Sequence, residues 1–376
     1  MENKVSIKEI AHLFLKLGFI GFGGPAAHIA MMQQEVVVKR KWMSEQHFLD
    51  LLGATNLIPG PNSTEMAIHI GYDKGGWKGL LAAGLCFILP AVFITGIFAF
   101  LYQQYGQLPE VQPFIYGIKP AIIAIIIGAV FPLAKKSFKS TFLAIIGFVV
   151  LALSLFDVNE IFLMFGAGIW AVVFFYFQHR KTNTLQSIAP FVLLKISTSN
   201  FISETNIRLF CIFLKIGAIL YGSGYVLFAF LDTELVATGL LTRQQLMDAI
   251  AVGQFTPGPV FSSVTFIGYQ INGISGAVLS TIAIFLPSFV FVALLNPLMK
   301  RMRQSKELSA FLDAVNVASV AIIAAVCFAM GKETITDWRT IVIALTSAFI
   351  VFKSKKINSA FIVLGGALLG YILKTI

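Results

Sequence analysis

The chain carries one pattern of short peptides twice, at a nearly constant separation. The separation drifts by only two residues over landmarks that keep their order, which indicates that one unit has been duplicated. This restricts the fold to two copies of a single architecture. Three landmarks recur 197 to 199 residues later: residues 14–18 as 213–217, residues 59–61 as 257–259, and residues 70–72 as 267–269.

Long apolar stretches fill each copy. Residues 79–101, 114–134 and 311–330 approach the roughly 20 residues that an α-helix needs to cross a bilayer. Charged residues make up 12% of the chain, whereas soluble domains carry about 25%. The sequence therefore predicts an all-α integral membrane protein with the lipid bilayer as its surroundings. The first apolar segment lacks a small-residue cleavage site and is expected to be retained.

Basic residues are distributed oppositely in the two copies. Residues 103–109 contain no Lys or Arg while the equivalent residues 300–306 contain four, and residues 135–139 contain three while 332–336 contain one. All five pairs of equivalent loops show this opposition. Because Lys and Arg concentrate in cytoplasmic loops, the two copies are expected to insert in opposite senses, as an inverted-topology repeat.

The duplication also divides the chain. It predicts an N-terminal transmembrane repeat over residues 1–177 and a C-terminal inverted repeat over 207–376. Residues 178–206 are expected to form a cytoplasmic linker with an interfacial helix, since their polar residues disfavour a thirteenth span. Each half contains six apolar segments, of which the first, residues 8–30, is expected to cross the membrane. The second, residues 46–70, has basic loops on both sides and is too short to cross twice, so we expect it to be re-entrant and the chain to cross ten times.

A Pro-Gly-Pro peptide (PGP) interrupts this second segment in each half. Proline removes backbone donors and breaks a helix, and the new helix that follows has free N–H groups and a partial positive charge that suit an anion. The alternative interpretation is a kink in a packed helix. The candidate ligands are Asn56, Pro59, Gly60, Pro61, Asn62, Ser63, Thr64 and Glu65 in the first half and Gln254, Pro257, Gly258, Pro259, Ser262 and Ser263 in the second.

Small residues follow the first helical segment of each half and are a second candidate. Gly23 and Gly24 in the first half, with Gly222 and Ser223 in the second, would let a helix unwind near a ligand. Close helix packing explains them equally well. No strand precedes these residues and no GKS or GKT follows, so they are not a nucleotide loop.

Ionisable residues within the apolar segments are the third candidates. Lys16 and Lys215 occupy equivalent positions and would present positive charge to a dianion, although they could also extend to the membrane surface. Glu65 and His28 could each carry a coupled proton. Hydrogen bonding to neighbouring helices is the simpler explanation for both.

Several functions are not supported. The net charge of +10 lies in short loops between apolar segments, so no nucleic-acid partner is expected. Cys86, Cys211 and Cys327 are isolated, without spacing for a metal site or a disulfide framework. No nucleophile with an adjacent base is evident, so we predict neither an enzyme nor a bound cofactor.

Two motifs carry a resemblance to a known family. Phe22-Gly23-Gly24-Pro25 with Ala27-His28, followed by Leu57-Ile58-Pro59-Gly60-Pro61-Asn62-Ser63-Thr64, is similar to the signature of the chromate transporter family. Gln254 to Pro259 resembles its degenerate second copy. The resemblance extends over the whole chain, as in the long, two-domain members.

The resemblance implies export of chromate, a tetrahedral dianion similar to sulfate, by secondary transport across the cytoplasmic membrane of a prokaryote. The first half has Asn56 at a position where family members often have Gln. The second half has Gln at the equivalent position, Gln254, so the choice among oxyanions stays open. The coupling ion, the direction of transport and the subunit number, including a homodimer, are also open. An anion-selective channel or passive pore is the alternative function.

Overall fold

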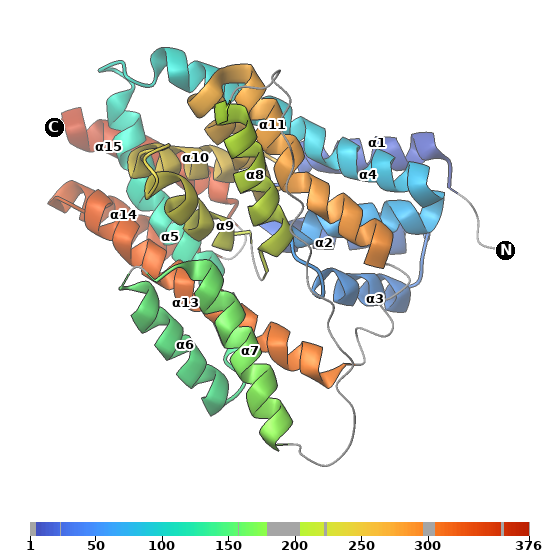
Figure 1. The fold of residues 1–376 in the computed structure, drawn as a ribbon. Helices are drawn as coiled ribbons and strands as arrows, with labels where there is room; N and C mark the ends of the chain where they lie inside the picture. Colours follow the sequence, from blue (N-terminus) through green and yellow to red (C-terminus); the bar gives the residue numbers. More distant parts are fainter. Residues whose placement is uncertain are drawn as a thin grey trace.

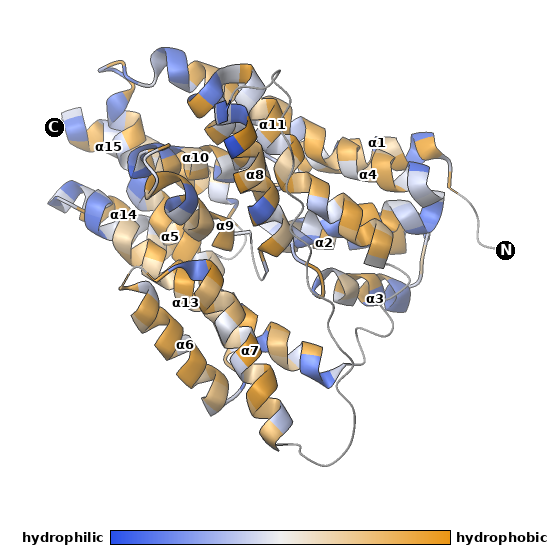
Figure 2. Ribbon diagram, viewed as in Figure 1, coloured by the Kyte–Doolittle hydropathy of each residue, from blue (hydrophilic) through white to orange (hydrophobic). Residues whose placement is uncertain are grey.

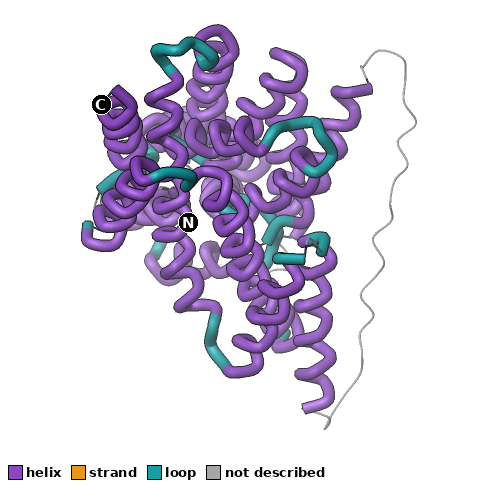
Figure 3. The backbone as a smooth tube through the Cα atoms, turned by 90° about the vertical axis from the view of Figure 1, so that its left-hand side faces the viewer, coloured by secondary structure: helices purple, strands orange, loops and turns teal. Residues whose placement is uncertain are grey.

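The computed structural model describes residues 5–22, 24–156, 158–178, 204–221, 224–295, 305–354 and 357–375. Helices form nearly all of these residues and no strand occurs among them (Figure 3). The predicted all-α class is confirmed. Of the predicted features, most of the linker over 178–206 and the candidate residues Gly23, Gly222 and Ser223 lie outside the described residues.

The helices repeat in the same order in both halves (Figure 1). The first half contains α1 (Ile7–Ile20), α2 (Gly24–Gln33), the π-helix η1 (Gln34–Lys39), α3 (Glu45–Thr55), α4 (Asn62–Tyr105), α5 (Gln112–Ser137), α6 (Thr141–Ser154) and α7 (Glu160–Gln178). The second half contains α8 (Glu204–Ile219), α9 (Val226–Leu231), the π-helix η2 (Asp232–Val236), α10 (Arg243–Phe255), the 3-10 helix η3 (Val260–Ser262), α11 (Ser263–Leu295), α13 (Lys306–Thr334), α14 (Trp338–Lys353) and α15 (Ser359–Thr375).

The long helices α4 and α11 each reverse direction at one glycine. Gly76 has φ 57° and ψ −147°, and its equivalent Gly273 has φ 57° and ψ −148°. Glycine adopts this left-handed backbone without steric cost. A side chain on Gly71 would overlap the carbonyl of Gly79, so the chain folds tightly back on itself. Each helix therefore has a short arm before the glycine and a long arm after it.

The first apolar segment also folds back. Arg40 Nη1 lies 2.9 Å from Glu9 Oε1, and Lys16 Nζ lies 3.2 Å from Glu35 Oε1. These pairs join the beginning of α1 to the end of η1, so both ends of the segment lie together. Residues 8–30 are not one continuous helix, because the chain turns between α1 and α2 at the glycines where the sequence predicts that a helix could unwind. That this segment crosses the membrane stays a prediction.

Five described helical segments are long and apolar enough to cross a membrane: α4, α5, residues 160–177, residues 260–294 and α13. α6 and α15 are apolar but shorter. The other segments expected to cross are shorter: α6, α14 and α15 have 14, 16 and 17 residues, and the first segment of each half is divided into shorter helices. Hydrophobic residues cover most of α6, α7 and α11, and hydrophilic residues gather near helix ends (Figure 2).

The two halves exchange partners. α5 packs against α14 and α15 of the second half, and α13 packs against α6 and α7 of the first. The Tyr116 hydroxyl, near the start of α5, donates to Asp337 Oδ2 at 2.5 Å, which lowers the pKa of the Asp337 carboxyl. The equivalent of Asp337 is Ser140, which follows the other end of α5. Equivalent loops thus lie at opposite ends of the same helix, as an inverted repeat requires.

A basic loop of the first half lies beside the start of α13. Lys139, in the basic loop after α5, lies 2.7 Å from Asp313 near the start of α13. α13 in turn follows the basic stretch over residues 300–306. The positive-inside rule assigns this end to the cytoplasm.

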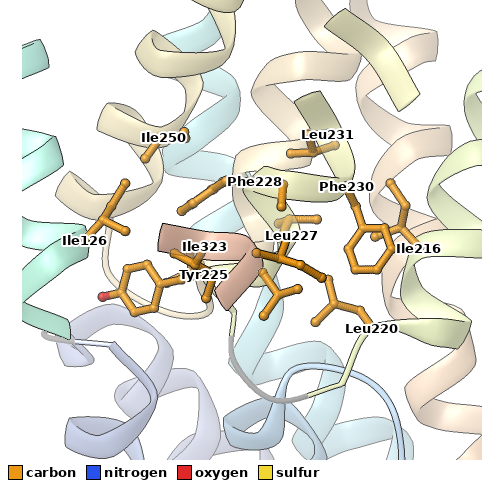
Figure 4. Packing of buried hydrophobic residues seen from close by; sticks show 14 of the residues in the cluster. Ile126, Ile216, Leu220, Tyr225, Leu227, Phe228, Phe230, Leu231, Ile250 and Ile323 are labelled. Carbon is orange, nitrogen blue, oxygen red and sulfur yellow. The ribbon is translucent and has the colours of Figure 1, made fainter. Parts of the chain in front are cut away.

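The short helix α9 lies at the centre of the hydrophobic core (Figure 4). All six of its residues are buried. Its equivalent region in the first half, α2, buries only His28 and Met32. The halves therefore share a topology but not a core. The residues packed around α9 include Ile216 and Leu220 near α8, Ile126 from α5, Ile250 from α10 and Ile323 from α13.

Candidate functional site

Both PGP peptides break a helix, as the sequence predicts. α3 ends at Thr55 and α4 begins at Asn62, while α10 ends at Phe255 and η3 begins at Val260. The central glycines have positive φ, 133° at Gly60 and 87° at Gly258. Other residues adopt this backbone only with strain, so each peptide needs its glycine.

Each PGP break is attached to the other half of the chain. The Gly60 N–H donates to the Leu220 carbonyl at 2.8 Å, and the Gly258 N–H donates to the Gly21 carbonyl at 2.7 Å. Leu220 and Gly21 occupy equivalent positions, directly after α8 and α1. The two hydrogen bonds are thus reciprocal and bring the broken helices together at the contact between the halves.

New helices start immediately after both breaks. The first turn closes through hydrogen bonds from the Thr64 N–H to the Pro61 carbonyl at 2.8 Å and from the Ser262 N–H to the Pro259 carbonyl at 2.9 Å. The N–H groups at the very start of a helix have no acceptor within it. With the helix dipole, they provide partial positive charge to an anion from both halves.

Polar side chains beside the breaks are buried without partners. Thr64 and Ser263 are fully buried and Gln254 is 6% exposed. The hydroxyl oxygens of the two smaller residues and the Gln254 Nε2 atom have no hydrogen-bond partner among the described residues. Buried donors are nearly always satisfied, by protein, water or a ligand. The two hydroxyl groups are free to donate to a bound molecule.

The long arm of each half contacts the break of the other. Thr95 of α4 donates to the Ser262 hydroxyl at 3.4 Å, and Ser288 of α11 donates to Glu65 Oε1 at 3.4 Å. A side chain on Gly258 would lie 2.8 Å from the Ala91 side chain. Both breaks are therefore closely covered by protein.

His28 connects the first glycine break to the PGP break. Its Nε2 lies 2.8 Å from the Gly21 carbonyl, and its Nδ1 lies 3.3 Å from the Ser63 hydroxyl. A carbonyl only accepts, so Nε2 carries the proton; in the neutral ring, Nδ1 then accepts from Ser63. The Gly21 carbonyl also accepts from Gly258. One carbonyl thus joins His28 to the opposite half.

Gly24 lies beside residues of the second half. A side chain at Gly24, whose φ is +79°, would lie 3.8 Å from the Tyr225 hydroxyl. Tyr225 is hydrogen-bonded to the Gln254 side chain. Nothing in the sequence distinguishes Tyr225 as a site residue, because an aromatic residue beside an apolar stretch is typical of a hydrophobic core.

The other predicted ligands lie away from this arrangement. Lys16 pairs with Glu35 at 3.2 Å and Lys215 pairs with Glu234 at 2.5 Å, and about half of each lysine side chain is exposed. These equivalent ion pairs neutralise the lysines, and a role in anion binding stays a prediction. Asn56 is exposed and accepts from the Asn62 amide at 2.9 Å.

A second buried cluster joins the halves at the contact between α4, α5 and α10. The Tyr102 hydroxyl donates to Asp248 Oδ2 at 2.6 Å, and Lys119 Nζ lies 3.6 Å from Asp248 Oδ1. The sequence marks Lys119 and Asp248 as charges in apolar surroundings, but it does not show that they meet. In the other half, Asn316 stands at the position equivalent to Lys119.

Comparison with known proteins identifies the family of the chain. The family model described as "Chromate transporter" matches residues 8–172 and again residues 207–371. The chain is 31% identical to the chromate transport protein of Cupriavidus metallidurans, over 98% of this chain and 93% of that protein. It is 30% identical to the probable chromate transport protein of Synechococcus elongatus, over 98% and 95%.

A further relative, the chromate transport protein of Pseudomonas aeruginosa, is 27% identical over 98% of this chain and 92% of its own. No solved structure matches the chain. The relatives are named as transport proteins, which is consistent with a chain that is not an enzyme. The repeated family match and the apolar helices show a multi-pass protein of a prokaryotic cell membrane, and the chain belongs to the chromate transporter family.

Proposed function

We propose that the chain is a secondary active transporter that exports chromate, or a related tetrahedral oxyanion such as sulfate, across the cytoplasmic membrane. The anion would bind between the two PGP breaks. The observation that carries the proposal is the reciprocal pair of hydrogen bonds from Gly60 to Leu220 and from Gly258 to Gly21. Each bond attaches one helix break to the residue that follows the first helix of the other half, so both breaks lie at the contact between the halves, which is the usual position of a transporter site.

The chemistry of the neighbouring groups supports an oxyanion. Thr64 and Ser263 supply hydroxyl donors that are buried and unpartnered among the described residues. A tetrahedral dianion has oxygens in four directions and can accept from several donors at once, and hydrogen bonds to charged groups are the stronger ones. The buried surroundings would exclude competing water.

The inverted repeat supports alternating access. In related architectures, one repeat moves against the other around a fixed site, which opens it to each side in turn. Here each long arm packs on the break of the other half, through Ser288 on Glu65 and Thr95 on Ser262. A movement of one half would therefore change the cover of the site.

The test is chromate flux into liposomes that contain the purified protein. A transporter predicts uptake that saturates with chromate concentration, and labelled chromate that accumulates transiently when the vesicles are preloaded with unlabelled chromate. Flux that rises linearly without such counterflow would indicate the alternative, a channel or passive pore. No flux above that of empty vesicles, under any imposed gradient, would contradict both.

A further inference from the structure

Glu65 lies in the first turns of α4, directly after the PGP break, and is completely buried. Its Oε1 accepts from Ser288 at 3.4 Å, and its Oε2 has no hydrogen-bond partner among the described residues. Glu65 forms no ion pair with any residue that the structure describes. A buried carboxylate without a countercharge is very unfavourable, so in this closed arrangement the group carries a proton.

Among the described residues, the titratable groups around Glu65 do not include a permanent cation. His69, one turn later on α4, is 1% exposed, and neither of its ring nitrogens has a hydrogen-bond partner in the described part of the chain. Tyr221, which follows α8, is close enough to be affected by the charge of Glu65. His28 is separated from it by Ser63, to which it is hydrogen-bonded. The charge of Glu65 is therefore free to change with access to water.

The carboxyl group occurs once, although the helix break occurs twice. The second half has a serine at the position of Glu65, Ser262 or Ser263 depending on where the offset shifts by one residue, and Phe266 at the position of His69. Ser262 accepts a hydrogen bond from Thr95, as a structural polar residue would. The broken-helix scaffold does not itself need an ionisable group, since the second half forms it without one.

The position of Glu65 bears directly on anion binding. Its side chain folds back over the PGP break, because a side chain on Gly60 would overlap Glu65 Oε1. An anion at the start of α4 would thus be close to this carboxyl group. Two like charges repel strongly in buried surroundings, so a dianion and an ionised Glu65 cannot occupy the site together.

We propose that Glu65 is a proton-binding site that couples one proton to each oxyanion carried, so that both move in the same direction. This inference rests on the proposed transport function. When the empty site opens to water, Glu65 releases its proton. The oxyanion binds once the proton returns, and the closed form carries both across. Release of the anion on the far side lets the proton leave there, and the empty protein returns with Glu65 ionised and hydrated, so that one net proton crosses with each anion.

The first test compares chromate binding to the wild type, E65Q and H69F between about pH 6.5 and pH 8.5. Chromate itself takes up a proton in this range, and this effect is the same for every variant. With one proton bound per anion, the affinity of the wild type should fall by up to about tenfold per pH unit relative to E65Q. H69F introduces the phenylalanine that the second half has at the equivalent position. Its affinity for chromate should change with pH as that of the wild type does. If the chromate affinities of the wild type and E65Q fall equally as the pH rises, Glu65 is not the proton-binding site.

The second test needs no variant. In liposomes with the unmodified protein at about pH 8, where chromate is almost entirely a dianion, chromate entry should acidify the interior by one proton per anion. Chromate entry without acidification would overturn the coupling and leave the transport function standing. An absence of chromate entry would instead overturn the proposed function.

Discussion

At the scale of residues, the sequence identifies the site by its glycines and prolines. The PGP peptides predict broken helices because proline lacks a donor and glycine permits positive φ, and both effects are local. The partners of these residues are not local. That Gly60 bonds to Leu220, or that Gly24 lies beside Tyr225, depends on how two distant segments meet.

The unpartnered hydroxyl groups give a prediction at this scale. T64V and S263A each remove a buried donor with little change in volume. Hydrogen bonds to charged groups contribute about 1.5–3 kcal/mol, so each variant should weaken chromate binding by about tenfold or more. Titration of the detergent-solubilised protein measures this. T346V, which removes a hydroxyl bonded to its own helix on α14, is the control and should bind as the wild type does. Unchanged affinity in both T64V and S263A would exclude these hydroxyls as ligands.

At the scale of elements, the sequence predicts the helix breaks at the PGP peptides and at the glycines after the first helix, but not the direction that the chain takes after the glycines. The re-entrant segment over residues 46–70 was expected from its flanking charges, and the structure brings its ends together through His47 and Asp73, 3.0 Å apart; its position in a membrane stays a prediction. The turn between α1 and α2 interrupts an apolar stretch that resembles one crossing. That the chain folds back at this turn is seen from long-range ion pairs such as Arg40 with Glu9.

The buried ion pair of Lys119 and Asp248, which joins α5 to α10, gives a prediction about the stability of the fold. Removing one partner of a buried ion pair leaves an uncompensated charge and costs about 3–5 kcal/mol. K119M and D248N should therefore each lower the free energy of unfolding by about that amount, measured by denaturation in detergent. The double variant should be more stable than either single variant, since no unpaired charge remains. If the double variant instead loses the sum of the stabilities lost by the two single variants, the two residues do not interact.

At the scale of the whole molecule, the duplication and the opposite loop charges were sufficient to predict two inverted halves. The reason is physical, since insertion of each copy responds to the Lys and Arg content of its own loops. The exchange of partners, with α5 between α14 and α15, could not be predicted, because it depends on packing between helices from different halves.

The inverted arrangement predicts which loops face the same solution. Lys139 and Thr336 occupy equivalent positions, after α5 and after α13, and both are exposed. In a variant without the native cysteines, K139C should react with an impermeant thiol reagent only from the cytoplasmic side and T336C only from the outside. Labelling of both from one side would contradict the inverted topology.

The account depends most on the claim that the two PGP breaks form one anion site. Chromate titration of the folded protein tests it directly, with G60A, G258A and the control G239A. All three glycines have positive φ, but a side chain on Gly239 would have no atom within 4 Å. We predict one chromate per chain, at least about tenfold weaker binding in both G60A and G258A, and unchanged binding in G239A. Wild-type affinity in a folded G60A or G258A would contradict a site shared between the halves.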